Sequence, residues 1–202
     1  MKEILVSSNN ADKLSEIKEV FKDENLKILS LKDVNINIEV IEDQDTLEGN
    51  ALKKAKEIFL ISKVPTISDD TGLFVEALNG EPGVYSSRYA GENVSYNDNC
   101  VKLLENMDGI PEQQRVAYFK CVICFYVEEN KYYMFDGICS GKIINEKRGT
   151  KGFGYDPTFI PDGFDKTFAE MDIDRKNEIS HRGKALEKLR RFIKVYFSQN
   201  TI

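Results

Sequence analysis

The chain has 202 residues, of which 41% are hydrophobic and 31% are charged, and its formal net charge is −6 at pH 7. A chain of this length can bury a core without disulfides or metal staples, and the composition is that of a globular protein. The negative balance argues against nucleic acid or an anionic membrane as a general partner, so an anionic substrate would need local lysines and arginines.

The N-terminal sequence MKEILVSSNN contains only a short apolar run, too short for a signal peptide, and no apolar stretch approaches the length that crosses a bilayer. We therefore expect a cytoplasmic protein. Cys121 and Cys124 form a C-x-x-C pair inside a strand-like run, where positions i and i+3 point to opposite faces. We expect these two thiols, like Cys100 and Cys139, to be reduced and packed as small apolar groups.

The first part of the chain predicts alternating strands and helices from its apolar periodicity. The expected strands are 3–7, 27–31 and 64–68, and the expected helices are 11–22 and 47–62. Asn9 or Asn10 is suited to cap the first helix. An acidic loop, EVIEDQD at 39–45, precedes the second helix. The strand at 64–68 is expected to end at Asp69 and Asp70.

The second part of the chain predicts a helix at 96–107 that begins with Ser95 and Asp98 as a capping pair. Two long strand-like runs, 115–128 and 131–144, predict an antiparallel hairpin. A last helix is expected at 181–198. No linker marks a boundary, so residues 1–202 are expected to form one domain of the α/β class. The long hairpin favours an elongated, two-lobed mixed sheet flanked by helices over a doubly wound one.

Two polar clusters follow predicted strands in the first part. In SSNNADK, Ser8, Asn10 and Lys13 offer a phosphate-binding turn beside helix N–H groups, although an ordinary helix cap explains them as well. In SDDTG, adjacent carboxylates repel each other unless they are solvated or neutralised. They are suited to hold Mg²⁺ and to accept a proton from an attacking water, and the alternative is a solvated turn through Thr71 and Gly72.

Two further clusters follow in the second part. In KGFGYDP, the glycines allow close approach of a flat ligand, and Phe153 or Tyr155 is suited to stack on a base, although a turn that packs two aromatics into the core is the alternative. In RKNEISHRGKAL, His181 is the one histidine of the chain and lies beside Arg182 in a basic stretch. This stretch suits an anionic substrate, and a solvated charged face is the alternative.

Taken together, five stretches of the sequence resemble one family. SSNNADKLSEI, TLEGNALKKA, SDDTGLFVEALNGEPGVYSSRYAG, GFGYDPTFIP and SHRGKAL are similar to segments of the inosine/xanthosine triphosphate pyrophosphatases, which remove deaminated purines from the nucleotide pool. The resemblance covers nearly the whole chain. It implies hydrolysis of ITP, dITP and XTP to a monophosphate and pyrophosphate, a Mg²⁺ cofactor, and a homodimer in which two lobes surround a central nucleotide cleft.

The resemblance also implies roles for individual residues. Asp70 is expected to be the general base and a metal ligand, with Asp69 beside it in the catalytic pair. Glu42 is expected to be the second metal ligand, although Glu39 stays open because the family's usual glycine is missing from EDQDT. The residues expected at the triphosphate and the purine are Ser8, Asn10, Lys13, Lys54, Thr71, Phe153, Gly154, Tyr155, Asp156, Lys176, His181 and Arg182. Among them, the three lysines are expected to hold the anionic phosphates.

Two departures from the family pattern occur. Ser8-Asn9-Asn10 stands where Thr-Gly-Asn is common, and Gly49-Asn50-Ala51 stands where Glu-Asn-Ala is common. Neither departure removes a charge that the mechanism needs.

Selectivity is expected at the purine edge, because deaminated purines carry a 6-keto acceptor where adenine has an amine. Donors from His181, Arg182 or nearby backbone N–H groups would pair with the keto group, and each buried donor left unpaired costs about 1–3 kcal/mol. GTP also carries a 6-keto group, so its rejection must depend on the 2-amino group of guanine. A pyrophosphatase for modified pyrimidine triphosphates and a catalytically silent nucleotide-binding protein are the alternative functions.

Overall fold

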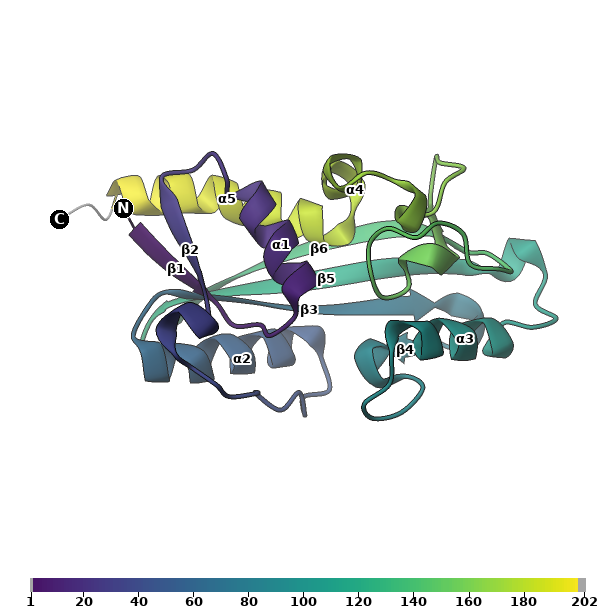
Figure 1. Ribbon diagram of the computed structural model, residues 1–202, viewed down its shortest axis with the longest axis horizontal. Helices are drawn as coiled ribbons and strands as arrows, with labels where there is room; N and C mark the ends of the chain where they lie inside the picture. Colours follow the sequence, from purple (N-terminus) through teal and green to yellow (C-terminus); the bar gives the residue numbers. More distant parts are fainter. Residues whose placement is uncertain (1, 200–202) are drawn as a thin grey trace. The chain divides into compact units, whose positions relative to one another are not determined.

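The computed structural model describes residues 2–199 and has an α/β fold with one seven-stranded mixed sheet (Figure 1). The strand order is β2-β1-β3-β5-β6-β7, with β4 paired to β3. Strand β1 pairs in parallel with β2 and β3, whereas β4 and β7 are antiparallel to their neighbours. The strands are β1 (Lys2–Val6), β2 (Leu26–Ser30), β3 (Thr66–Val75), β4 (Pro82–Gly83), β5 (Val116–Glu128), β6 (Lys131–Ile143) and β7 (Phe159–Pro161). The helices are α1 (Ala11–Val20), α2 (Leu47–Ser62), α3 (Tyr96–Asn106), α4 (Ile173–Ile179) and α5 (His181–Gln199).

This architecture confirms the predicted fold class and most of the predicted elements. The chain divides into two compact units. Unit 1 contains the described residues up to Asp70, Cys121–Gly137 and the described residues from Arg182 onward, and unit 2 contains Thr71–Lys120 and Ile138–His181. The central cleft between two lobes stays a prediction. None of the described helices combines the length and the apolar character that a bilayer crossing requires.

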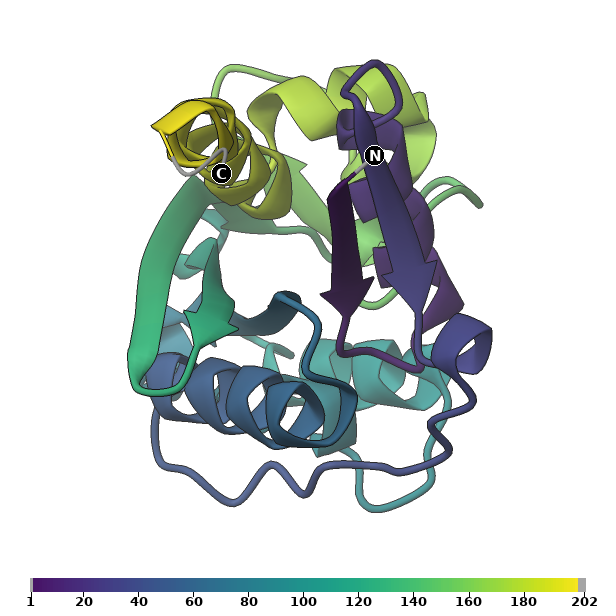
Figure 2. The ribbon, with the colours of Figure 1, turned by 90° about the vertical axis from the view of Figure 1, so that its left-hand side faces the viewer.

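Unit 1 has apolar cores on both faces of its strands, as the alternation of β1 requires. Ile4 and Val6 pack with Ile17 of α1 and with the apolar side of α5, whereas Leu5 points to the other face and packs with Ile58 of α2. Figure 2 shows α1 and α5 over one face of these strands and α2 over the other. Each of these helices therefore has an inward face, and charged residues on those faces have to find partners.

Unit 2 has its own core, in which α3 packs against aromatic side chains of β5 and β7. The predicted start of α3 is confirmed, because Ser95 Oγ accepts from the Asp98 N–H (3.2 Å) and the Asp98 carboxylate accepts from the Ser95 N–H (2.8 Å). All four cysteines are free and buried, as expected. Burial raises the pKa of the Cys124 thiol to about 12, so it is protonated and behaves as an apolar group.

The prediction that a strand ends at the two aspartates is wrong. Strand β3 continues through Asp69, Asp70, Thr71 and Gly72 to Val75, and both aspartates are buried, at 2% and 4% exposure. Gly72 was interpreted as a turn residue, but a Cβ there would lie 2.6 Å from the carbonyl oxygen of Gly83, so glycine is required for the close pairing of β3 and β4. Strand β7 and helix α4 were not predicted.

This close approach makes Gly72→Ala destabilising. The added methyl group meets backbone rather than a flexible side chain, so β4 must shift, and we expect the free energy of unfolding to fall by about 1–3 kcal/mol. Urea denaturation followed by circular dichroism measures the change. An unchanged midpoint and slope would show that β4 moves away at no cost.

Candidate active site

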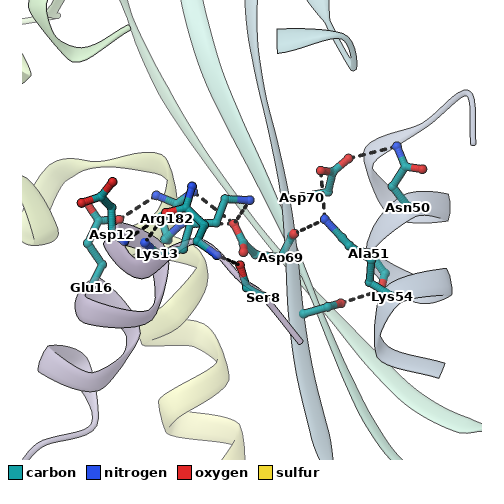
Figure 3. A network of polar contacts seen from close by, with 12 residues as sticks. Ser8, Asp12, Lys13, Glu16, Asn50, Ala51, Lys54, Asp69, Asp70 and Arg182 are labelled. Carbon is teal, nitrogen blue, oxygen red and sulfur yellow. Dashed lines mark hydrogen bonds and ion pairs between the residues drawn. The ribbon is translucent and has the colours of Figure 1, made fainter. Parts of the chain in front are cut away.

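The two adjacent aspartates of β3 point to opposite faces of the sheet, because side chains alternate along a strand. In Figure 3, Asp69 faces α1 and α5, whereas Asp70 faces α2. Each carboxylate therefore has its own set of partners within unit 1. The repulsion that suggested a shared neutralising cation is relieved by this divergence.

Asp69 is neutralised by cations of the chain itself. Its Oδ2 lies 3.2 Å from Lys13 Nζ and accepts from Arg182 Nε (3.2 Å) and Nη2 (3.1 Å). Burial alone would raise the pKa of Asp69, but the charges of Lys13 and Arg182 outweigh that effect and hold the pKa well below its usual range. A carboxylate with so low a pKa is a poor proton acceptor. Asp69 therefore pairs with Lys13 and Arg182 in this structure, and its expected place in the catalytic pair stays a prediction.

Arg182 completes this network from α5. Its Nη1 donates to Glu16 Oε2 on α1 at 2.6 Å, and its side chain is 3% exposed. The guanidinium thus binds two buried carboxylates, where the sequence had suggested a donor to the purine. The physical reason is Glu16, an acidic residue on the inner face of α1, which together with Asp69 uses donors on all three guanidinium nitrogens.

Asp70 has a different environment. Its Oδ1 lies 3.2 Å from Lys54 Nζ, and its Oδ2 accepts from Asn50 Nδ2 at 3.2 Å. Burial raises the pKa of Asp70; Lys54 lowers it and the nearby Glu42 raises it, with a net rise. A carboxylate with a raised pKa accepts a proton more readily, as a general base must.

Lys54, on α2, joins the acidic groups of this site. Besides Asp70, its ammonium contacts Glu42 Oε1 (2.5 Å) and the Asp69 carbonyl oxygen (2.7 Å). Burial would raise the pKa of Glu42, but Lys54 outweighs this and lowers it, so Glu42 is ionised. Glu39 is exposed. Of the two glutamates that the sequence left open, the structure favours Glu42.

The donor set fits Mg²⁺. Among residues 2–199, no cluster of three or more His, Cys, Asp or Glu side chains is arranged to hold a metal ion. Mg²⁺ does not need such a cluster, because it commonly uses one or two carboxylates together with water and substrate phosphates. Glu42 Oε1 and Asp70 Oδ1 lie 2.5 Å and 3.2 Å from the same atom, Lys54 Nζ, so the two carboxylates are close enough together to supply hard oxygen ligands to one ion.

The turn between β1 and α1 is partly used by the fold itself. Asn10 caps α1, since its Oδ1 accepts from the N–H groups of Asp12 (3.0 Å) and Lys13 (3.1 Å). Ser8 Oγ accepts from the Asn10 N–H at 3.2 Å. The turn can therefore offer a phosphate the Ser8 hydroxyl and the Lys13 ammonium. Thr71 lies in β3 and is partly buried.

The predicted purine segment GFGYDP lies in unit 2, and its residues have distinct environments. The Tyr155 hydroxyl donates to the Ser86 carbonyl at 2.8 Å, and the ring belongs to the unit 2 core, where burial raises its pKa. This position favours the core alternative for Tyr155. Phe153 is only partly buried, its ring contacts that of Tyr96 with centroids 5.8 Å apart, and its stacking on a base stays a prediction. The Gly154 carbonyl accepts from Cys100 Sγ (3.2 Å).

Lys176 and His181 are also buried in unit 2. Lys176 Nζ forms an ion pair with Asp156 Oδ2 at 2.7 Å, with both side chains at most 6% exposed. Its charge is therefore matched by Asp156, and its expected contact with the phosphates stays a prediction. The His181 ring stacks on Phe119, with centroids 4.5 Å apart and planes inclined by 10°.

Sequence reasoning missed Glu16 and Asn50. Both are polar residues on otherwise apolar helix faces: Glu16 precedes the buried Ile17, and Asn50 precedes the buried Ala51 and is 0% exposed. Asn50 holds Asp70 and also links to the Gln44 backbone, with its Oδ1 accepting from the Gln44 N–H at 3.0 Å. A polar residue on a predicted core face is the signal that could have identified them.

Comparison with known proteins shows which family this chain resembles. The Ham1 family model matches residues 4–192. A "dITP/XTP pyrophosphatase" of Caldanaerobacter subterraneus is 45% identical, with 99% of this chain and 100% of the relative covered, and one of Clostridium perfringens is 47% identical, with 94% and 96% covered. A solved HAM1 protein from Coxiella burnetii superposes with a TM-score of 0.87 at 38% identity, covering 96% of this chain and 99% of the other. The Staphylococcus aureus Ham1 structure gives a TM-score of 0.85 at 38% identity, with 96% and 100% covered. The chain belongs to the Ham1 family.

Proposed function

We propose that this protein is a nucleoside triphosphate pyrophosphatase that hydrolyses deaminated purine nucleotides, namely ITP, dITP and XTP. The observation that carries the proposal is the Asp70 carboxylate, buried, raised in pKa, and held between Asn50 and Lys54 next to Glu42. The names of relatives that are 45% and 47% identical, dITP/XTP pyrophosphatase, support the substrate class.

The residues of unit 1 supply the chemistry in this proposal. Asp70 accepts the proton of the water that attacks the α-phosphorus, the bond to the bridging oxygen breaks, and pyrophosphate leaves with that oxygen. Lys54 and Asn50 keep the Asp70 oxygens in place, and Ser8 and Lys13 bind the phosphates. When Mg²⁺ is bound by Glu42 and Asp70, it supplies positive charge at the phosphate oxygens.

Residues of unit 2 distinguish the purine in this proposal. Phe153 offers an aromatic face for stacking. His181 and backbone N–H groups of the same unit are the candidate donors to the 6-keto oxygen. An adenine would leave such donors without an acceptor, at about 1–3 kcal/mol each, so several donors reject ATP strongly. The relatives are named for purine substrates, dITP and XTP, and this argues against the alternative of a pyrophosphatase for modified pyrimidine triphosphates.

We further propose that the protein acts in the cytoplasm as a homodimer and takes no nucleic acid as a partner. The net charge of −6 supports the last point, because it repels a polyanionic duplex.

The test is release of pyrophosphate from ITP, XTP, dITP, ATP, GTP and modified pyrimidine triphosphates, with Mg²⁺ and with a chelator. Release from ITP should exceed release from ATP or GTP by at least about a hundredfold. For ATP, two or three unpaired donors cost about 2–9 kcal/mol together, whereas for GTP the penalty must come from its 2-amino group. Chelation should stop the reaction. Equal rates on all triphosphates would remove the specificity claim, and binding of ITP without hydrolysis would support the silent binding protein.

A further inference from the structure

The Lys176–Asp156 ion pair of unit 2 is not used by the chemistry above. Asp156 Oδ2 accepts from two donors at once, the Lys176 ammonium at 2.7 Å and the Phe153 N–H at 2.9 Å. A single buried oxygen thus ties α4 to the loop that carries Phe153. The pair is more than nine-tenths buried on both sides. A buried charge pair is costly to form unless further hydrogen bonds satisfy its atoms, and here the Phe153 N–H supplies one to Asp156.

The same ammonium also contacts the Phe153 ring. Lys176 Nζ lies 4.7 Å from the ring centroid of Phe153 and 5.8 Å from that of Phe168, within the range of a cation–π interaction. Phe153 is therefore held at two points, by its own N–H on Asp156 and by its ring on Lys176. The ring of Tyr96 also contacts the Phe153 ring, with centroids 5.8 Å apart.

Gly152 shows how closely the loop surrounds this carboxylate. A Cβ at Gly152 would lie 2.1 Å from Asp156 Oδ2, and the residue has φ +71°, a conformation that favours glycine. The backbone at position 152 therefore leaves no room for a side chain where the carboxylate meets the Phe153 N–H. Glycine at position 152 therefore allows the loop to approach the Asp156 carboxylate this closely.

We propose that Asp156 and Lys176 are positioning residues that fix the Phe153 ring as the platform for the purine base. This inference rests on the proposed function for the identity of the ligand. Lys176, which the family resemblance implied as a phosphate ligand, would instead position the ring on which the purine base stacks. Lys13 then remains as the lysine that binds phosphate, and Lys54 holds Asp70.

The first test is Asp156→Asn, which keeps the size and one acceptor oxygen but removes the charge that Lys176 needs. The KM for ITP should rise by at least about tenfold while kcat changes by less than about threefold, because the base platform is lost and the chemistry in unit 1 is intact. Inhibition by inorganic tripolyphosphate, which has no base, should be unchanged. Asp172→Asn is the matched control, since Asp172 pairs with Lys151 on the surface of the same unit and is 84% exposed.

The second test needs no turnover. The chain contains no tryptophan, so Phe153→Trp introduces a single fluorescent reporter at the platform. Time-resolved anisotropy should show a rotationally restricted indole in Phe153→Trp alone. Adding Asp156→Asn or Lys176→Met should free the indole, whereas adding Lys176→Arg or Asp172→Asn should not, because these keep the cation or lie outside the pair.

The outcomes separate this inference from the proposed function. Unchanged anisotropy in the Asp156→Asn and Lys176→Met backgrounds would overturn the positioning role, and so would a loss of tripolyphosphate inhibition, which a general structural defect or a phosphate ligand would cause. If the wild-type protein released no pyrophosphate from ITP, the proposed function would fail, but the anisotropy measurements would still decide whether the pair holds position 153.

Discussion

Asp70→Asn is expected to lower kcat for pyrophosphate release from ITP by about 10²–10⁴-fold, the range that a general base contributes. The substitution preserves the shape of the side chain and an oxygen that can accept from Lys54 or Asn50. The fold and the affinity for nucleotide should therefore be largely intact. What the variant loses is a carboxylate that can take a proton, and the amide cannot replace it.

Steady-state kinetics on ITP, together with thermal unfolding and equilibrium binding of the nucleotide, test this expectation. Asp43→Asn is the matched control, because Asp43 lies on the same acidic loop as Glu42 but its side chain is 54% exposed and pairs with Lys53. The control should behave as wild type. If Asp70→Asn kept near wild-type turnover, Asp70 would not be the base, and a large loss of thermal stability would indicate a structural role instead.

Elements defined by local periodicity were predictable from the sequence. Helix α2 has the predicted bounds, 47–62, and the two long strands of the hairpin differ from their predicted ranges by one residue at an end. Apolar residues repeat along these segments with the period of the element, so each segment carries its own evidence. The cap of α1 by Asn10 and the start of α3 were also predictable, because capping depends on residues within one turn of the helix start.

Features set by tertiary contacts were not predictable. Strand β3 continues past the aspartates between partners that the local sequence does not identify, β4 and β5. The seven-residue helix α4 is too short for a periodic signal. The partners of buried charges were missed for the same reason: Asp69 and Arg182 are 113 residues apart in the chain. Position in a motif indicated that these residues matter, whereas only the fold shows which of them hold others in place.

Arg182→Met is expected to lower the free energy of unfolding by about 3–5 kcal/mol, the usual effect of removing one partner of a buried ion pair. Arg182 is the cation between two buried carboxylates, Glu16 and Asp69, and its side chain is 3% exposed. Methionine fills a similar length but donates nothing, so both carboxylates would stay buried with less charge to balance them. Lys13 can still reach Asp69, at 3.2 Å, but Glu16 loses its arginine.

Thermal unfolding measures the effect, and a loss of this size should lower the midpoint by roughly 6–20 °C for a chain of this length. Arg191→Met is the matched control, since Arg191 lies on the same helix, is 78% exposed and pairs with Glu187 at the surface; its midpoint should hardly change. Adding Glu16→Leu to Arg182→Met should restore part of the stability, because it removes the carboxylate left without its arginine. If the double variant were less stable than Arg182→Met by the full cost of Glu16→Leu alone, the two residues would not be coupled, and Arg182 would be free to serve another role.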